Sequence, residues 1–130
     1  MSAANWRGKT ALITGAGSGF GLELARLAAR AGMRLVLVDV QADALAASVA
    51  EQRAAGALVM PFELSVADAN AMQAMAEQVE QQWGAPHLLF NNAGVGSGGL
   101  IWENSLDDWQ WVCWASTSWA WFMACACSPP

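Results

Sequence analysis

Tyrosine is absent from this sequence of 130 residues, histidine occurs once, and no lysine or arginine follows Arg53. Six basic against eleven acidic side chains give a net charge of −5, and no basic patch is present beyond Arg53. We therefore expect no nucleic acid partner, because nucleic acid phosphates bind clustered lysine and arginine. The one histidine, His87, stands at the start of an apolar run with no nucleophile beside it, which indicates a structural role.

Cysteine is absent from residues 1–112, which is typical of a cytoplasmic protein. The three cysteines lie in residues 113–130 with no histidine nearby, and one residue separates Cys125 from Cys127, so we expect no metal site. The first ten residues lack the apolar core of a signal peptide. These absences predict a cytoplasmic location.

The feature that organises the sequence is a short apolar run at residues 11–14, followed by a glycine-rich turn and an amphipathic helical pattern. The turn region contains Gly15, Gly17, Gly19 and Gly21. Glycine lets the backbone reach positive φ values and lets a ligand approach where a Cβ would obstruct it. A helix N-terminus adds unpaired N–H groups and a partial positive charge, so this arrangement is typical of a phosphate-binding site.

A glycine cluster alone is equally consistent with a tight turn. The next apolar run, at residues 35–38, is closed by an acidic residue, Asp39. It stands about 20 residues beyond the turn, where dinucleotide-binding folds carry the acid that accepts hydrogen bonds from the adenosine ribose. The combination of strand, turn, helix and acid favours dinucleotide binding over a simple turn.

Two motifs resemble those of the short-chain dehydrogenase/reductase family, in its compact single-domain branch. They are Thr14-Gly15-x-x-x-Gly19-x-Gly21 and, directly after a second apolar run, Asn91-Asn92-Ala93-Gly94. The resemblance covers residues 6–112. It implies hydride transfer between a nicotinamide dinucleotide and a small alcohol or carbonyl substrate. For the intact parent enzyme it also implies a homo-oligomer.

The remaining apolar runs alternate with helical patterns. Strands are predicted at residues 34–39, 57–62 and 87–90, and helices at residues 42–54 and 67–83. This alternation predicts an α/β protein of the Rossmann type, with a parallel sheet in the strand order 3-2-1-4 and helices on both faces. Both motifs then lie at the carboxyl ends of strands, beside the crevice where the strand order reverses.

Three local features of the helices can also be predicted. Ser65 and Asp68 resemble a capping box at the start of the third helix, with aspartate in place of the preferred glutamate. In the second helix, the helical period predicts a buried face of Leu45, Ala46 and Val49 and an exposed face of Glu51, Gln52 and Arg53. In the third helix, the same period predicts core packing for Met72, Met75, Ala76 and Val79.

The family resemblance implies which residues bind the cofactor, position by position. The pyrophosphate would be held by Gly15, Ser18, Gly19, Phe20 and Gly21. The other parts of the cofactor would be bound by Asp39 at the adenosine ribose, Glu63 and Leu64 at the adenine, and Asn91, Ala93 and Gly94 at the second ribose and the sheet core. Phe20 replaces the family's usual isoleucine, and Glu63 replaces its usual aspartate.

The expected cofactor is NAD rather than NADP. Asp39 would accept hydrogen bonds from the 2′-hydroxyl of the ribose and would repel a 2′-phosphate. Its neighbours Val38, Val40 and Gln41 include no cation. Ser18 also stands where NADP-preferring relatives often have a basic residue.

The catalytic residues of the resembled family have no counterpart in this sequence. The family uses a tyrosine as acid and base, a nearby lysine that lowers the tyrosine pKa, a serine and an asparagine. Here tyrosine is absent, and the only lysine, Lys9, precedes the first strand. We therefore predict no catalytic residue and no turnover by the chain as written. The alternative is a non-catalytic dinucleotide-binding module whose hydrophobic tail docks on a partner.

The composition changes at residue 113. Residues 113–130 carry no charge and three of the eight tryptophans, and they are too short and too interrupted by serine and threonine for a membrane span. When their codons are read one base earlier, the forced residues give Leu-Gly-x-x-x-x-Gly-x-Val-x-Gly, which resembles the family's helix at this place. We interpret residues 1–112 as the cofactor-binding domain and residues 113–130 as an out-of-frame tail, produced near the Val112 codon. The alternative is a genuine divergent tail.

Overall fold

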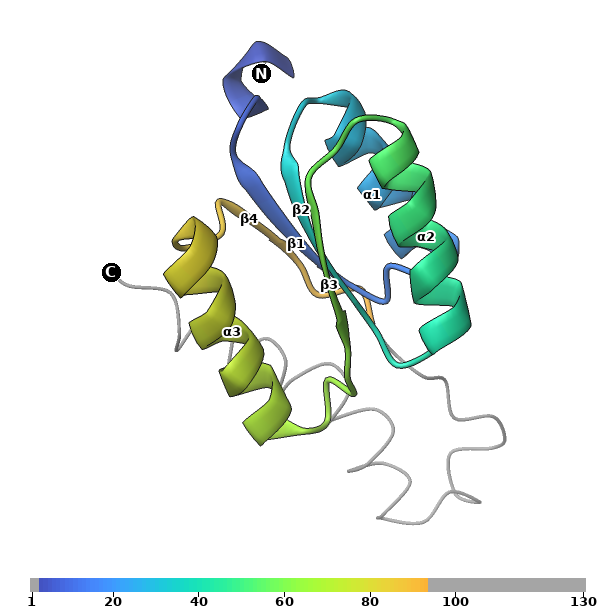
Figure 1. Ribbon diagram of the computed structural model, residues 1–130, viewed down its shortest axis with the longest axis vertical. Helices are drawn as coiled ribbons and strands as arrows, with labels where there is room; N and C mark the ends of the chain where they lie inside the picture. Colours follow the sequence, from blue (N-terminus) through green and yellow to red (C-terminus); the bar gives the residue numbers. More distant parts are fainter. Residues whose placement is uncertain (1–2, 94–130) are drawn as a thin grey trace, which may run out of the picture.

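Strands and helices alternate along residues 3–93, the part of the chain that the computed structural model describes (Figure 1). The elements are a 3-10 turn (Ala3–Trp6), β1 (Thr10–Thr14), α1 (Gly19–Arg30), β2 (Arg34–Asp39), α2 (Ala42–Ala54), β3 (Val59–Glu63), α3 (Ala69–Trp83) and β4 (Leu88–Phe90). No helix within this range is long and apolar enough to cross a membrane. Gly94 and the tail predicted at residues 113–130 lie outside the described residues.

The four strands form one parallel sheet in the order β3-β2-β1-β4. Leu12 of β1 pairs with Val36 of β2 on one side and with Leu89 of β4 on the other. This strand order confirms the predicted Rossmann-type fold. The order reverses between β1 and β4, so the ligand crevice expected of such a sheet lies at the carboxyl ends of these two strands.

Helices cover both faces of the sheet, α1 and α2 on one side and α3 on the other (Figure 1). Successive side chains of a strand point to opposite faces. Ile13 and Leu37 therefore pack with α1 and α2, whereas Leu12, Val36 and Val38 pack with α3. Each buried aliphatic side chain contributes about 1.5–3 kcal/mol to folding. Coverage of both faces explains why the central strands read as continuous apolar runs.

The third helix begins later than the sequence predicted, and the capping box at Ser65 is wrong. Asp68 is the N-cap, and its Oδ1 accepts a hydrogen bond from the N–H of Ala71 at 3.0 Å. Ser65 instead stabilises the preceding turn, where its hydroxyl accepts from the N–H of Ala67 at 3.2 Å. Aspartate is as good an N-cap as serine, so the residue nearer the helix takes this role.

The second helix buries Leu45 and Val49 and exposes Glu51 and Arg53 as its period predicted, but two residues differ. Gln52, expected to be exposed, is 1% exposed, and Ala46, expected to be buried, is exposed. The cause is that α2 packs beside α1 as well as on the sheet, and Gln52 borders the groove of about 520 Å³ between the two helices.

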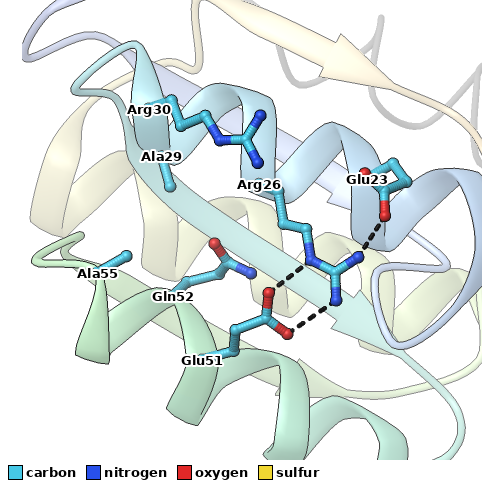
Figure 2. Close-up of a pocket in the computed structure, with 7 residues that line it drawn as sticks. All are labelled: Glu23, Arg26, Ala29, Arg30, Glu51, Gln52 and Ala55. Carbon is cyan, nitrogen blue, oxygen red and sulfur yellow. Dashed lines mark hydrogen bonds and ion pairs between the residues drawn. The ribbon is translucent and has the colours of Figure 1, made fainter.

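A bidentate ion pair joins α1 to α2 across this groove (Figure 2). The Nη2 of Arg26 donates to Oε2 of Glu51 at 3.1 Å, and its Nε donates to Oε1 of the same carboxylate. Glu23, on α1, also pairs with Arg26. Because the Arg26 guanidinium donates to it, the pKa of Glu51 is lowered from its ordinary value.

The outer edge of β3 presents an interrupted row of backbone groups to another strand. The N–H of Leu35 on β2 donates to the carbonyl of Leu58 at 2.8 Å, so the backbone groups of the odd-numbered residues of β3 point away from β2. Among these, Pro61 has no N–H to offer. The carbonyl of Val59 already accepts a hydrogen bond from the Nη2 of Arg53 at 3.2 Å.

Candidate functional site

The carboxyl ends of the strands bring together predicted site residues that are far apart in the sequence. The glycine turn (residues 15–18) links β1 to α1, and the N–H of Ala16 donates to the carbonyl of Val38 at 3.1 Å. This bond holds the turn over the end of β2, beside Asp39. Asn91 follows directly after β4, which is the neighbour of β1 on the other side.

Two glycines let the turn and the start of α1 approach each other closely. A Cβ on Gly21 would lie 2.0 Å from the carbonyl oxygen of Gly15, well inside contact distance. Gly15 itself has a φ of 67°, and a Cβ there would lie 3.0 Å from the Cα of Ala93. Glycine is therefore required at Gly21 by space, and at Gly15 by both space and backbone conformation.

Helix α1 begins at Gly19 without a side-chain cap. Ser18 is extended, with φ −157° and ψ 169°, and its hydroxyl makes no capping hydrogen bond. The first N–H groups of an α-helix have no acceptor within the helix itself. Ser18, Gly19 and Phe20 are exposed, Phe20 by 84%. With the partial positive charge of the helix N-terminus, these N–H groups can bind an anion such as a pyrophosphate.

Asp39 is held by backbone N–H groups on both of its carboxylate oxygens. Oδ2 accepts from the N–H of Gly17 at 2.8 Å, and Oδ1 accepts from the N–H of Gln41 at 2.9 Å. The half-buried residue ends β2 and so ties the glycine turn to the start of α2. Since an ionised carboxylate has about four acceptor positions, it can still accept hydrogen bonds from a ligand.

Glu63 and Leu64 lie at the same end of the sheet, on the side of β3. Glu63 is exposed and pairs with Asp39 in the β2–β3 register. Leu64 is half-buried, and its N–H donates to the carbonyl of Asp39 at 3.2 Å. The structure therefore positions both residues beside Asp39 and away from β4.

A hydrogen-bonded junction that the sequence did not predict joins the glycine turn to the end of β4. The hydroxyl of Thr14 accepts from the N–H of Asn92 at 3.1 Å and from the N–H of Ala93 at 3.0 Å, and it donates to the carbonyl of Phe90 at 3.3 Å. The Asn92 amide donates to the carbonyls of Thr14 and Gly15, each at 3.4 Å. Thr14 belongs to the glycine motif and Asn92 to the second sequence motif. Their places in these motifs are the signal that could have identified them.

Asn91 carries an acceptor that the described residues leave unsatisfied. The residue is half-buried, and its Oδ1 is buried without a hydrogen-bond partner within residues 3–93. A buried acceptor of this kind costs free energy unless a donor reaches it. Asn91 stands directly after β4, at the end of the sheet where the strand order reverses.

Comparison with known proteins identifies the family. The sequence pattern described as short chain dehydrogenase matches residues 9–125. The chain belongs to this family. The match extends past Val112, where the sequence predicted a break. Among curated relatives of this chain, the probable oxidoreductase EphD of Mycobacterium bovis is 41% identical over 100 residues, which are 77% of this chain and 17% of that protein.

Another curated relative is the C alpha-dehydrogenase of Sphingobium sp. (strain NBRC 103272 / SYK-6), 37% identical over 83% of this chain and 36% of its own length. Solved structures of short-chain dehydrogenases have the same fold. One from Burkholderia phymatum, in complex with NAD, is 45% identical with a TM-score of 0.86 over 94% of this chain and 43% of its own. The L-sorbose reductase of Gluconobacter frateurii, complexed with NADPH and L-sorbose, is 32% identical with a TM-score of 0.89 over 96% and 48%. The chain therefore spans less than half of each of these four relatives.

Proposed function

We propose that this chain is the cofactor-binding part of an oxidoreductase and binds NAD at the carboxyl ends of β1, β2 and β4. The glycine turn and the uncapped N-terminus of α1, beside the carboxylate of Asp39, carry this proposal. The NAD and NADPH recorded with solved relatives support a nicotinamide dinucleotide as the ligand class.

The residues at the crevice fit the parts of such a dinucleotide. Backbone N–H groups at the start of α1 would bind the pyrophosphate. Asp39 would accept from the adenosine ribose, and Glu63 with Leu64 would flank the adenine. The unsatisfied Oδ1 of Asn91 would accept a hydrogen bond from the nicotinamide half. Ala93 and Gly94 complete the proposed set.

The preference for NAD over NADP follows from charge. Solved relatives include both an NAD and an NADPH complex, so family membership leaves the choice open. Asp39 would accept hydrogen bonds from a ribose 2′-hydroxyl and repel a 2′-phosphate. Its two hydrogen bonds from backbone N–H groups keep the carboxylate at this position.

We further propose that the chain as written binds the cofactor without turnover. The sequence has no tyrosine, and Lys9 precedes β1, so it lies at the opposite end of the sheet from the site. The intact parent enzyme would act on a small alcohol or carbonyl compound as a cytoplasmic homo-oligomer. The bound nicotinamide would accept or donate the hydride in that reaction.

Titration of the full chain with NAD and NADP, followed calorimetrically, tests the proposal. We expect saturable binding with NAD preferred, and no NADH formation when alcohols are added. Gly21→Ala should abolish binding, because its Cβ would lie 2.0 Å from the Gly15 carbonyl oxygen. Ala54→Ser is the matched control, since it adds one atom at an exposed position in the last turn of α2, remote from the site. A folded chain that binds neither nucleotide contradicts the proposal.

The identity of the tail needs a separate experiment. We propose that residues 113–130 are an out-of-frame product, because the shifted codons encode a pattern that resembles the family helix. The second candidate is a non-catalytic module whose uncharged tail docks on a partner. Nucleotide sequencing across the Val112 codon distinguishes them, since a long open frame one base earlier supports the first and an early stop in that frame supports the second.

A further inference from the structure

We infer that Gly17 is a specificity-determining residue for the cofactor and acts through Asp39. The inference rests on the proposed binding of NAD. It assigns Gly17 a role in choosing between NAD and NADP that is separate from pyrophosphate binding.

A glycine is required at position 17 because a side chain would not fit there, and not because of the backbone conformation. The described glycines with positive φ are Gly8, Gly15, Gly19, Gly32, Gly56 and Gly84, so Gly17 has a φ that other residues can adopt. A Cβ at Gly17, however, would lie 2.8 Å from Oδ2 of Asp39 and 2.9 Å from the Cβ of Ala44. The missing side chain is therefore what allows the Asp39 carboxylate to reach the N–H of Gly17.

A side chain at Gly17 would meet both Asp39 and Ala44, and both contacts must be relieved. The Cβ of Ala44 is attached directly to the backbone of α2, and the Ala44 carbonyl carbon would lie only 3.1 Å from the new Cβ. The Oδ2 of Asp39 is the end of a side chain with two rotatable bonds. Rotation of Asp39 relieves the first contact, and a small movement of the glycine turn away from α2 relieves the second. Both movements break the hydrogen bond between Asp39 and the N–H of Gly17.

Displacement of Asp39 should change the affinities for the two cofactors in opposite directions. With both oxygens held by Gly17 and Gln41, the carboxylate stays where it can accept from the two hydroxyls of a ribose. In the same position, the negative charge of Asp39 repels the 2′-phosphate of NADP. A rotated carboxylate loses contacts to NAD and repels NADP less, so the ratio of the two affinities falls by roughly tenfold, the effect of one hydrogen bond to a charged group.

The test compares Gly17→Ala with a control, Ala54→Ser at an exposed position in the last turn of α2, in the full chain by titration with NAD and with NADP. We expect the affinity ratio to fall roughly tenfold in Gly17→Ala and to stay unchanged in the control. The double variant Gly17→Ala/Asp39→Ala should have the ratio of Asp39→Ala alone, because both changes remove one interaction. An unchanged ratio in Gly17→Ala, or additive effects in the double variant, would overturn the inference.

A second measurement needs no bound nucleotide and separates this inference from the proposed function. Hydrogen exchange of the Gly17 amide should be slow in the wild-type chain and faster in Asp39→Ala. Equal exchange in the two folded proteins overturns the inference even if NAD binds. Failure of the wild-type chain to bind either nucleotide, with the Gly17 amide still protected by Asp39, instead contradicts the proposed function alone.

Discussion

Thr14 links the two motifs through a single hydroxyl group. Thr14→Val keeps the shape of the side chain but leaves the N–H groups of Asn92 and Ala93 without their acceptor. An unsatisfied buried donor costs about 1–3 kcal/mol, so we expect the free energy of unfolding to fall by about that amount. Urea denaturation followed by circular dichroism measures the change.

Thr10 provides the matched control at the other end of β1. Its Oγ1 is buried without a hydrogen-bond partner within residues 3–93. Thr10→Val removes an unsatisfied polar atom and should leave stability unchanged or slightly higher. Equal destabilisation by Thr10→Val and Thr14→Val would show that the Thr14 junction contributes nothing specific.

The sequence predicts which residues gather at the site better than it predicts how they bond. The alternation of strands and helices is enough to bring Asp39 and the glycine turn to one edge of the sheet. It does not reveal that Asp39 accepts from the N–H of Gly17, or that Asn92 rather than Asn91 bonds to the turn. Those choices depend on how the chain turns after β4. That turn is fixed by contacts between residues that are 77 or more positions apart in the sequence.

Among the helices, the pairing of α1 with α2 should depend on pH. Hydrogen bonds from Arg26 lower the pKa of Glu51 below the ordinary value of a glutamate, about 4.3. The stabilisation is therefore fully present above that value and is lost as the pH falls through the lower, folded-state pKa. Glu51→Gln should be less stable than the wild-type chain at pH 6, and the difference should vanish in strong acid.

Thermal unfolding across this pH range checks the prediction, and salt supplies the control. Both partners are partly exposed, so the contribution is small and 1 M salt should reduce it further. A difference between Glu51→Gln and the wild-type chain that persists unchanged at low pH would mean that the ion pair is not its source.

Helix faces are predicted well where only the sheet contacts them. Met72, Met75 and Val79 of α3 are buried and Ala76 is half-buried at the spacing that the sequence shows, and the three buried residues pack against the side chains of β1 and β2. Gln52 of α2 is buried because α1 lies beside it, and no local pattern in α2 indicates that neighbour. The helical period therefore predicts burial wrongly at residues where one helix contacts another.

At the scale of the whole molecule, the outer edge of β3 affects whether the sheet can pair with a strand of another copy. Arg53 bonds to the carbonyl of Val59, and Pro61 removes an N–H, so another strand finds few partners there. Arg53→Ala combined with Pro61→Val should open this edge and increase the size of the assemblies seen by sedimentation velocity. Arg30→Ala removes the same charge from α1 and should sediment like the wild-type chain, whereas identical sedimentation of all three proteins would contradict the prediction.

The asymmetry of the sheet also sets a limit on polymer length. A repeating unit must join neighbours at two places to form a fibre, and a unit that joins at one place forms pairs at most. Within residues 3–93, Arg53 and Pro61 weaken pairing at one of the two edges of the sheet, so edge-to-edge growth of this sheet beyond a pair is disfavoured. The two residues thus act on the described sheet as a chain terminator acts in polymerisation, by making one end of the unit a poor site for addition.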